Sequence, residues 1–488
     1  RPVTLRRSFA WSFTEQFGQR VLQFAGSVAI ARLLTPDEVG VFALAMAVNA
    51  LLASVREFGV GAYLVRESEL SDDKIRTAFG LWLALAWPLA ALLAAIAPWV
   101  AGLYATPGIA EVLWVVALNF VLMPFGQPAQ ALLQREMRFD LLNHVTLTSA
   151  AVKIAATVGF ALLGWSYMAL AWGMLLGSAV RVGLLLALRP AHLRLRPSLR
   201  HWRAVMQFGG WLTGAQITGT LTIEGQKFLL GGFLTPAAVA LYERAVQLPA
   251  IARESLFQPI GRVLFPSFSA DLRAGRPIGA KVEMLIAATT VLIWPAFAVL
   301  ALLAEPVVVA LFGEPWRMAG TILPWLLLGQ ALLALLPQPE QILTPHGRVR
   351  RLFALRSFAC LNSLAFGAVG ALHSLTLFAQ LRPVTTLVFI TVTWLALRGL
   401  IQVRPARLLR HHGTALVVTL ATAAPALLVR TQYGTEVPPA VLAAAFAVAP
   451  LPWLLALWGL GHPLSGEIGH LLRGAGGRAR ALIGGVPR

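Results

Sequence analysis

Long, almost uncharged stretches follow one another along most of the chain, up to about residue 460. Of the 488 residues, 58% are hydrophobic and only 12% are charged, whereas a soluble domain carries about 25% charged residues. A membrane-spanning helix needs about 20 mostly apolar residues, and these stretches lack the alternation typical of barrel strands. The sequence therefore predicts an all-α polytopic membrane protein with about 14 transmembrane helices.

The apolar stretches and the positions of turn residues give a set of candidate spans. They cover residues 8–34, 38–62, 77–103, 110–133, 140–164, 166–188, 204–233, 236–262, 280–304, 318–343, 352–372, 374–398, 413–430 and 438–460. Several are longer than one bilayer crossing requires, so we expect tilted helices or helices that extend into the cytoplasm.

The net charge is +19, and the positions of the basic residues predict how the chain crosses the membrane. Arg and Lys gather in alternate gaps between spans, because cytoplasmic loops are enriched in them. The basic gaps contain Arg66, Lys74 and Arg76; Arg135 and Arg138; Arg189 to Arg203; Arg273 to Lys281; Arg348 to Arg351; and Arg404 to Arg410. Both termini are also basic and should face the cytoplasm. No long polar segment carries this charge, so we do not expect nucleic acid as a partner.

Two short motifs occur twice in the same order, which indicates an internal repeat. Leu34-Thr35-Pro36 recurs as Leu234-Thr235-Pro236, and Gln127-Pro128-Ala129-Gln130 recurs as Gln338-Pro339-Glu340-Gln341. Each half would hold six spans, so the halves would share one orientation, as parallel repeats do. The predicted parts are an N-terminal lobe (1–190), a basic cytoplasmic linker (191–203), a C-terminal lobe (204–400), an extra helix pair (401–460) and a basic cytoplasmic tail (461–488).

Charged residues inside the spans are the candidate functional residues, since an isolated charge in hydrocarbon is costly and normally faces a cavity or a partner. Cations outnumber anions there, and guanidinium groups bind phosphate oxygens in pairs. We therefore predict a cationic cavity that accepts a pyrophosphate or an acidic sugar. Its candidate substrate-binding residues are Arg20, Arg56, Lys153, Arg181, Arg244 and Arg253.

The acidic residues in the spans allow a second interpretation, in which charges neutralise one another. Glu224 and Lys227 lie three residues apart and would meet on one helix face. The candidate coupling or charge partners are Glu15, Glu57, Glu224 and Lys227. The sequence leaves open which charges line a cavity and which form pairs.

Tryptophans near span ends are typical of anchors at the membrane interface. Trp99, Trp165, Trp211 and Trp316 occupy such positions, and we expect each of them to lie at the interface.

Motifs of several enzyme classes are missing from the sequence. There is no phosphate-binding loop of P-loop ATPases and no His-Glu-x-x-His zinc motif. The single cysteine, Cys360, excludes an intramolecular disulfide framework and a cysteine-based metal site. No loop between spans is long enough for a catalytic domain. We therefore expect a transporter without cofactor or metal, driven by a substrate or ion gradient.

Several segments resemble polysaccharide transporters of the multidrug/oligosaccharidyl-lipid/polysaccharide exporter superfamily, in its Wzx/WzxC branch. The resemblance covers roughly residues 8–400 and extends to the last helix pair. It rests on Ala31–Gly40 (similar to ARLLTPEDFG), Arg56–Gly61 (similar to DFGLG), Leu133–Phe139 (similar to L-x-R-x-M-x-F), Leu241–Ala245 and Pro259–Pro266.

This resemblance implies a function and a mechanism. Two six-helix lobes would form a V-shaped cavity, and alternating access would move undecaprenyl-pyrophosphate-linked oligosaccharide units across a bacterial inner membrane, for O-antigen, capsule or exopolysaccharide. The related lipid II flippases use cavity arginines on their first, second and eighth helices, where Arg20, Arg56 and Arg253 occur in this chain. The implied partners are the lipid-linked oligosaccharide, membrane lipids, and polysaccharide polymerase and export machinery.

Two other functions compete with this one. A cation-coupled multidrug exporter of the same superfamily would need acidic residues in its first lobe, where only Glu15 and Glu57 are available. A membrane-embedded glycan ligase or polymerase would need a sizeable external loop. Arginines outnumber those acidic residues, and the sequence has no such loop, so the flippase is the favoured interpretation.

Overall fold

Helices are the regular secondary structure of the described part of the chain, as the sequence predicts, and that part contains no β-strand. The structure, a computed structural model, describes residues 5–57, 59–67, 69–188, 196–200, 202–251, 253, 271, 274 and 276–462. Within these ranges, the side chains of 5–17, 20 and 203–215 are not described. The candidates Glu15 and Arg20 therefore lie on a described helix backbone, but their side chains lie outside the description.

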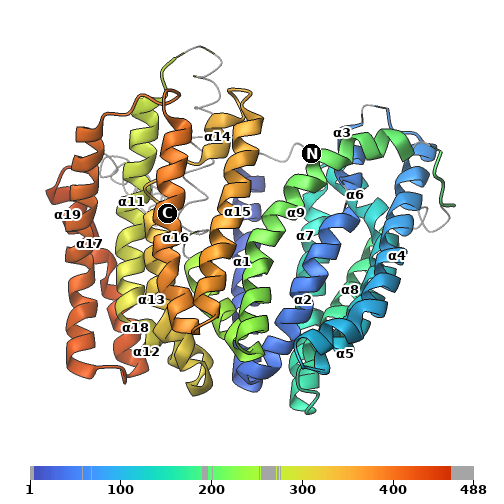
Figure 1. Cartoon of the computed structure of the whole chain (residues 1–488), viewed down its shortest axis with the longest axis horizontal. Coiled ribbons are helices and arrows are strands. Elements are labelled where there is room, and N and C mark those ends of the chain that lie inside the picture. Colours follow the sequence, from blue (N-terminus) through green and yellow to red (C-terminus); the bar gives the residue numbers. More distant parts are fainter. Residues whose placement is uncertain are drawn as a thin grey trace, which may run out of the picture. The chain divides into compact units, whose positions relative to one another are not determined.

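The helices follow one another with short connections (Figure 1). The first ten elements are α1 (Leu5–Leu33), α2 (Pro36–Glu57), α3 (Val60–Arg66), α4 (Asp72–Leu103), α5 (Gly108–Leu122), the 3-10 turn η1 (Met123–Gly126), α6 (Gln127–Arg135), α7 (Phe139–Leu162), α8 (Met168–Leu188) and α9 (Trp202–Phe233). Residues 236–251 are also helical. The others are α11 (Gly279–Leu302), α12 (Ala304–Phe312), η3 (Glu314–Trp316), α13 (Arg317–Leu333), α14 (Pro339–Leu343), α15 (Val349–Ala371), α16 (Leu375–Leu397), α17 (Pro405–Tyr433), α18 (Pro439–Val448) and α19 (Pro450–Gly459).

Ten helical segments among the described residues are long and apolar enough to cross a membrane. They are Pro36–Arg66, Asp72–Leu103, Gly108–Arg135, Phe139–Leu162, Met168–Leu188, Gly279–Leu302, Val349–Ala371, Leu375–Leu397, Pro405–Tyr433 and Pro439–Gly459. The multi-pass architecture is thus confirmed. The exact number of 14 spans stays a prediction, although α1 and α9, at 29 and 32 residues, also exceed the length of one crossing.

Contacts divide the chain into two compact units. The first contains Arg1–Glu243, Leu311–Trp316 and Ala359–Phe378, and the second contains Arg244–Ala310, Arg317–Phe358 and Ala379–Arg488. The division into two six-helix lobes, a linker, an extra helix pair and a tail remains a prediction from the sequence.

The repeated Leu-Thr-Pro motif begins a helix in both of its copies. Thr35 and Glu38 form a capping box at the start of α2: the Thr35 backbone N–H donates to Glu38 Oε2 at 2.7 Å, and the Glu38 N–H donates to Thr35 Oγ1 at 3.4 Å. In the second copy, the Ala238 N–H donates to Thr235 Oγ1 at 3.2 Å. The repeated sequence therefore encodes a repeated helix start.

The two copies of this motif also touch each other. Gly40 packs so closely on the second copy that a Cβ atom would lie 1.9 Å from the carbonyl oxygen of Pro236. Farther along, Ser54 Oγ on α2 and Thr220 Oγ1 on α9 are 2.9 Å apart. α2 therefore packs on α9 and on the start of the helix that follows α9, and the contact with Pro236 needs glycine at position 40.

Helices α7 and α8 pack through small residues, as is common in membranes. A Cβ at Gly173 would lie 2.0 Å from Thr157 Oγ1, and one at Gly177 would lie 2.7 Å from Cβ of Lys153. This close contact fixes α8, the helix that carries Arg181.

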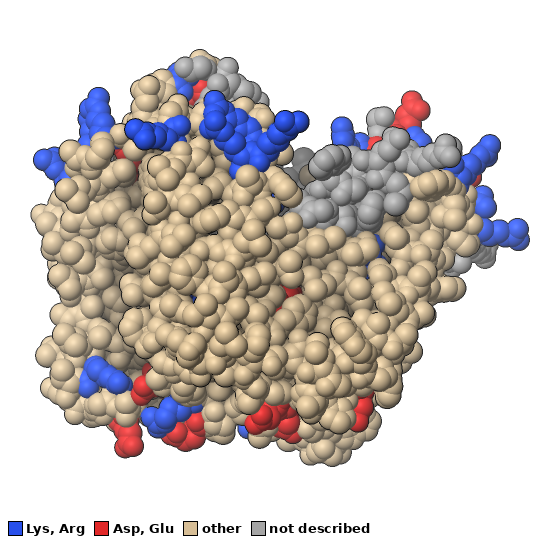
Figure 2. Space-filling model, in the orientation of Figure 1, with Lys and Arg blue, Asp and Glu red and all other residues tan. Residues whose placement is uncertain are grey.

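Charged and apolar side chains are separated on the surface of the second unit. Figure 2 shows Lys and Arg gathered at one end of the second unit, where α15 and α17 begin and α16 ends, above a largely uncharged band. Large apolar side chains are exposed along α17, including Leu416, Leu420 and Leu428, the last two at 64% and 62%. Water would disfavour such a surface, whereas lipid favours it.

A buried carboxylate joins α11 to the start of α17 in the second unit. Glu283 is only 4% exposed, and its Oε1 accepts a hydrogen bond from the backbone N–H of Arg404 at 2.6 Å. Arg407 lies 3.9 Å from Oε2. Around this contact, Ile278, Val282 and other apolar residues form a core cluster.

We expect Glu283→Ala to destabilise the protein by about 1–3 kcal/mol, since it leaves a buried N–H without its acceptor. Glu283→Gln retains an acceptor oxygen and should lose less. Thermal unfolding of the purified protein in detergent measures both variants. An alanine variant that unfolds at the wild-type temperature would show that this contact contributes nothing.

The expectation for Trp316 is wrong. Its side chain is fully buried, and Nε1 donates to the Ala31 carbonyl at 2.8 Å. Nearby, Arg32 Nε donates to the Leu311 carbonyl at 2.9 Å. The indole ties residues 311–316 to the end of α1, whereas Trp99 is 70% exposed, as an interfacial residue should be.

Candidate cationic pocket

A break between α2 and α3 forms one wall of the candidate site. α2 ends at Glu57, and Gly59 has a φ of 65°, a conformation that favours glycine. The break lies where the sequence predicts one continuous span, 38–62, and it leaves Arg56 and Glu57 at a helix end.

The opposite wall comes from a second irregular segment. The 3-10 turn η1 separates α5 from α6, and it contains Pro124, whose ring cannot continue the α-helical hydrogen bonds. α6 then carries Gln127, Gln130 and Gln134 at spacings of three and four residues, which place them on one helix face.

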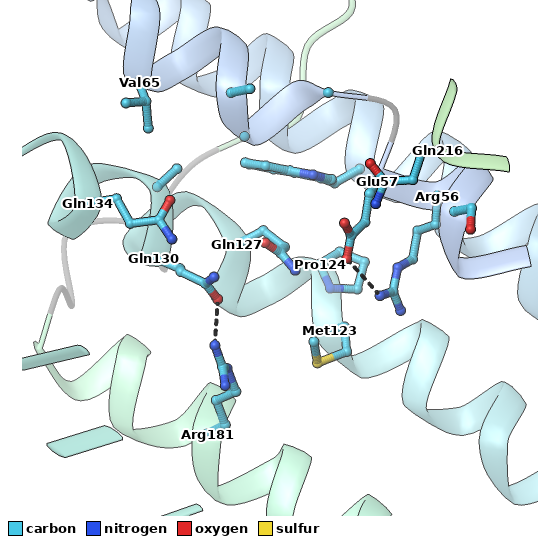
Figure 3. A pocket seen from close by; sticks show the side chains of 16 residues that line it. Arg56, Glu57, Val65, Met123, Pro124, Gln127, Gln130, Gln134, Arg181 and Gln216 are labelled. Atoms are coloured by element: carbon cyan, nitrogen blue, oxygen red, sulfur yellow. Dashed lines mark hydrogen bonds and ion pairs between the residues drawn. The ribbon is translucent and has the colours of Figure 1, made fainter. Parts of the chain in front are cut away.

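These walls enclose a cavity of about 710 Å³ within the first unit, a size typical of ligand-binding pockets. Figure 3 shows Arg56, Glu57 and Gln216 on one side and Gln130, Gln134 and Arg181 on the other. The lining residues come from α2, α3, α4, α6, α8 and α9 and from the segments between α2 and α3 and between α5 and α6. Val65 and Gln134 also line the cavity, next to Arg66 and Arg135, so it reaches toward the basic end of this unit.

Arg56 is held in place by its neighbours. Its guanidinium carbon lies 4.7 Å from the ring centroid of Phe120, a cation–π contact. One of its nitrogens lies 3.9 Å from Glu57 Oε1, and the Arg56 side chain is 11% exposed, compared with 61% for Glu57. Arg56 is therefore oriented without a tight ion pair, and Glu57 is the more accessible of the two.

Arg181 enters the pocket from α8. Its Nη2 donates to Gln130 Oε1 at 3.1 Å, the contact drawn in Figure 3. Its buried Nε finds no acceptor among the described residues. A buried donor without a partner is rare in proteins, and a guanidinium with a spare donor suits an anionic ligand. With two cations and one anion, the charged residues that line the pocket carry a net charge of +1.

Three other sequence-predicted cations, Lys153, Arg244 and Arg253, are described and do not line this pocket. Lys153 lies on α7, and its side chain is exposed. In the second unit, Arg244 Nη1 donates to Gln247 Oε1 at 3.1 Å. Arg253 lines a separate cavity of about 160 Å³ together with Gln330, Gln338 and Thr289. The roles of all these residues, and of Arg20, stay predictions.

Lys227 belongs to an ion-pair cluster. Its Nζ lies 2.8 Å from Glu224 Oε2, as their spacing allows, and it also pairs with Glu243. The contribution of Glu243 could not be read from the sequence, because it depends on residues 236–251 returning along α9.

The described residues contain no group of three or more His, Cys, Asp or Glu side chains that could hold a metal ion. The described polar groups of the pocket are instead guanidinium, amide, carboxylate and hydroxyl groups, which can bind phosphate and sugar oxygens directly.

Residues 29–320, well over half of the chain, match the family described as "polysaccharide biosynthesis protein". The chain belongs to this family. The matched region includes every residue that lines the 710 Å³ pocket, so the family assignment covers the whole candidate site.

Relatives of this family member carry names that refer to polysaccharide transport or lipopolysaccharide biosynthesis. The chain is 27% identical to the succinoglycan biosynthesis transport protein ExoT of Rhizobium meliloti (strain 1021), covering 75% of each chain. It is 24% identical to the lipopolysaccharide biosynthesis protein WzxC of Escherichia coli (strain K12), over 59% of each.

Among solved structures, the chain shares its fold with the lipid II flippase MurJ in an inward closed conformation. The TM-score is 0.75, with 11% sequence identity, over 91% of this chain and 97% of that one. An inward-facing multidrug transporter of the MATE family aligns with a TM-score of 0.56, with 12% identity, over 78% and 95%. These structures show the same fold, and the family match together with the named relatives confirms the family indicated by the sequence motifs.

Proposed function

We propose that this protein is a flippase that moves polyprenyl-diphosphate-linked oligosaccharide units across the membrane for O-antigen, capsule or exopolysaccharide synthesis. The undecaprenyl carrier of bacterial membranes is the expected lipid. ExoT and WzxC, which are named for polysaccharide transport and lipopolysaccharide synthesis, support this assignment. It is a transporter and not an enzyme, in keeping with its relatives.

The observation that carries the proposal is the pair of arginines in one polar pocket. Arg56 and Arg181 line the same cavity, and no described residue accepts a hydrogen bond from Nε of Arg181. A diphosphate offers several oxygens to such donors, and guanidinium groups bind them more strongly than neutral donors would. A cationic drug would be repelled by the net positive charge of the pocket, so the geometry favours the flippase over the drug exporter.

Alternating access supplies the movement in this proposal. The two solved structures with a similar fold are described as "inward closed" and "inward-facing". These descriptions support a protein that opens toward one side of the membrane at a time. The substrate would enter from the basic end of the first unit, where the pocket reaches Val65 and Gln134.

The basic ends of both units should face the cytoplasm of a bacterial inner membrane, with both termini on that side. The chain allows a direct check, because its single cysteine is buried and can be replaced as Cys360→Ser. The variant Arg138→Cys should react with an impermeant thiol reagent only after the cells are opened. Thr106→Cys, in the connection between α4 and α5, should react in intact cells. The reverse pattern would overturn the orientation.

Polysaccharide polymerase and export machinery are the proposed partners, since they would consume the translocated units. Deleting the gene in its native host and restoring it on a plasmid tests the function. Loss of the surface glycan, together with accumulated lipid-linked oligosaccharide, is the expected result. Unchanged glycan with increased drug sensitivity would favour the drug exporter instead, and accumulated translocated but unpolymerised units would favour a polymerase.

A further inference from the structure

A row of glutamine side chains extends from the arginines along one wall of the pocket. Gln127, Gln130 and Gln134 on α6 all line the cavity, and Gln216 on α9 lines it as well (Figure 3). Seven residues of α-helix span about 10 Å, so the row is long enough to contact more than one part of an extended ligand. Residues 127–134 contain no charged side chain, so this row was not singled out from the sequence.

Two of these amides have no partner in the part of the chain that the structure describes. Among the described residues, the side chains of Gln127 and Gln134 form no hydrogen bond, although both are half-buried. Gln130 differs, because its oxygen accepts from Arg181. Arg181 therefore contacts the middle of the row, and an amide without a partner among the described residues lies one helical turn away on either side.

An amide group matches the chemistry of a sugar better than that of an anion or a cation. Each glutamine has an acceptor oxygen and two N–H donors. A sugar hydroxyl also both donates and accepts, whereas a phosphate oxygen at neutral pH mainly accepts and an ammonium group only donates. Glu57, which is 61% exposed at the same pocket, adds a further acceptor for hydroxyl groups.

The internal repeat places the same residue types at a pocket in the second unit. Gln338 and Pro339, the counterparts of Gln127 and Pro128, line the smaller cavity with Arg253. Gln330 lines that cavity too, and its buried Oε1 finds no donor among the described residues. In each unit, a glutamine from the repeated motif thus lines a pocket together with an arginine. The start of a helix does not by itself require this arrangement.

We propose that Gln127 and Gln134 form a saccharide subsite, in which their amides bind the hydroxyl groups of the sugars nearest the diphosphate. Gln130 is a positioning residue that orients Arg181. The inference rests on the proposed function, since it assumes that the arginines hold the diphosphate.

Binding of two probes to the purified protein separates the subsite from the diphosphate anchor. One probe is a short-chain polyprenyl diphosphate without sugar, and the other is the same lipid with a neutral oligosaccharide attached. The double variant Gln127→Leu/Gln134→Leu should weaken binding of the glycosylated probe by roughly 4- to 100-fold, at about 2- to 10-fold for each lost amide. Binding of the sugar-free probe should stay unchanged.

Two further variants control for folding and for amide loss elsewhere. Gln432→Leu removes an exposed glutamine at the end of α17 and should alter neither affinity. Gln134→Asn keeps the amide on a shorter side chain, so it should bind the glycosylated probe more weakly than wild type but more tightly than Gln134→Leu. Thermal unfolding identifies any variant that has lost its fold.

Each outcome has a distinct meaning. If wild type binds both probes with equal affinity, or if the double variant weakens both equally, the saccharide subsite is overturned while the diphosphate anchor stands. If wild type binds neither probe, the proposed function itself fails.

Discussion

Removing the positive charge of Arg181 is expected to weaken binding of a polyprenyl diphosphate by about 10- to 100-fold, because hydrogen bonds between charged groups contribute about 1.5–3 kcal/mol each. Arg181→Gln keeps a polar side chain but loses the charge and the guanidinium fork. Arg181→Lys restores the charge without the fork and should recover part of the affinity. Titration of the purified variants with the lipid measures these losses.

Arg56 should behave in the same way, with one difference. Its guanidinium also contacts the Phe120 ring, so Arg56→Gln should lower thermal stability as well as affinity. Arg410, an exposed arginine on α17, provides a matched control, because Arg410→Gln removes one positive charge far along the sequence from the pocket-lining residues. If Arg410→Gln weakens binding as much as Arg181→Gln does, the effect is general electrostatics and the pocket is not the anchor.

The largest structural effect is expected at Gly40. Its missing side chain lets α2 contact Pro236, and an added Cβ would meet the carbonyl carbon and oxygen at 2.2 and 1.9 Å. Backbone cannot rotate away as a side chain can, so Gly40→Ala should cost about 1–3 kcal/mol or more. Yield of folded protein and the unfolding temperature measure this effect.

Gly183 on α8 is the matched control, since a Cβ there would meet nothing within 4 Å. Alanine is the better helix former by about 1 kcal/mol. Gly183→Ala should therefore leave stability unchanged or raise it slightly. Equal losses at the two positions would mean that the close contact between the repeated motifs contributes no more than general helix effects.

The fold was largely predictable from the sequence because hydrocarbon imposes a simple rule. Uncharged stretches of about 20 residues form helices when no water can satisfy their backbone. The break at Gly59 was missed, because the hydropathy of the surrounding residues does not reveal that a glycine has a positive φ. The burial of Trp316 was also missed, because tryptophan near a span end is compatible with both an interfacial and a buried position.

The site was predictable only in part, for a related reason. Arg56 and Arg181 stand out because a charge in an apolar stretch needs an explanation. Gln127 and Gln134 carry no charge, and glutamine in a span has many packing uses. Their place in a pocket became visible only in the structure, where α6 lines one cavity together with Arg56 of α2 and Arg181 of α8.

The most direct test of the central claim is leaflet transfer in proteoliposomes. The protein is reconstituted with a polyprenyl-diphosphate lipid that carries a fluorescent oligosaccharide, and a membrane-impermeant reductant irreversibly bleaches every fluorophore that reaches the outer leaflet. We expect wild type to make nearly all of the fluorescence accessible, and Arg181→Gln to leave about the fraction seen in protein-free vesicles. Transfer by wild type no faster than in protein-free vesicles, with the native oligosaccharide attached, would contradict the account.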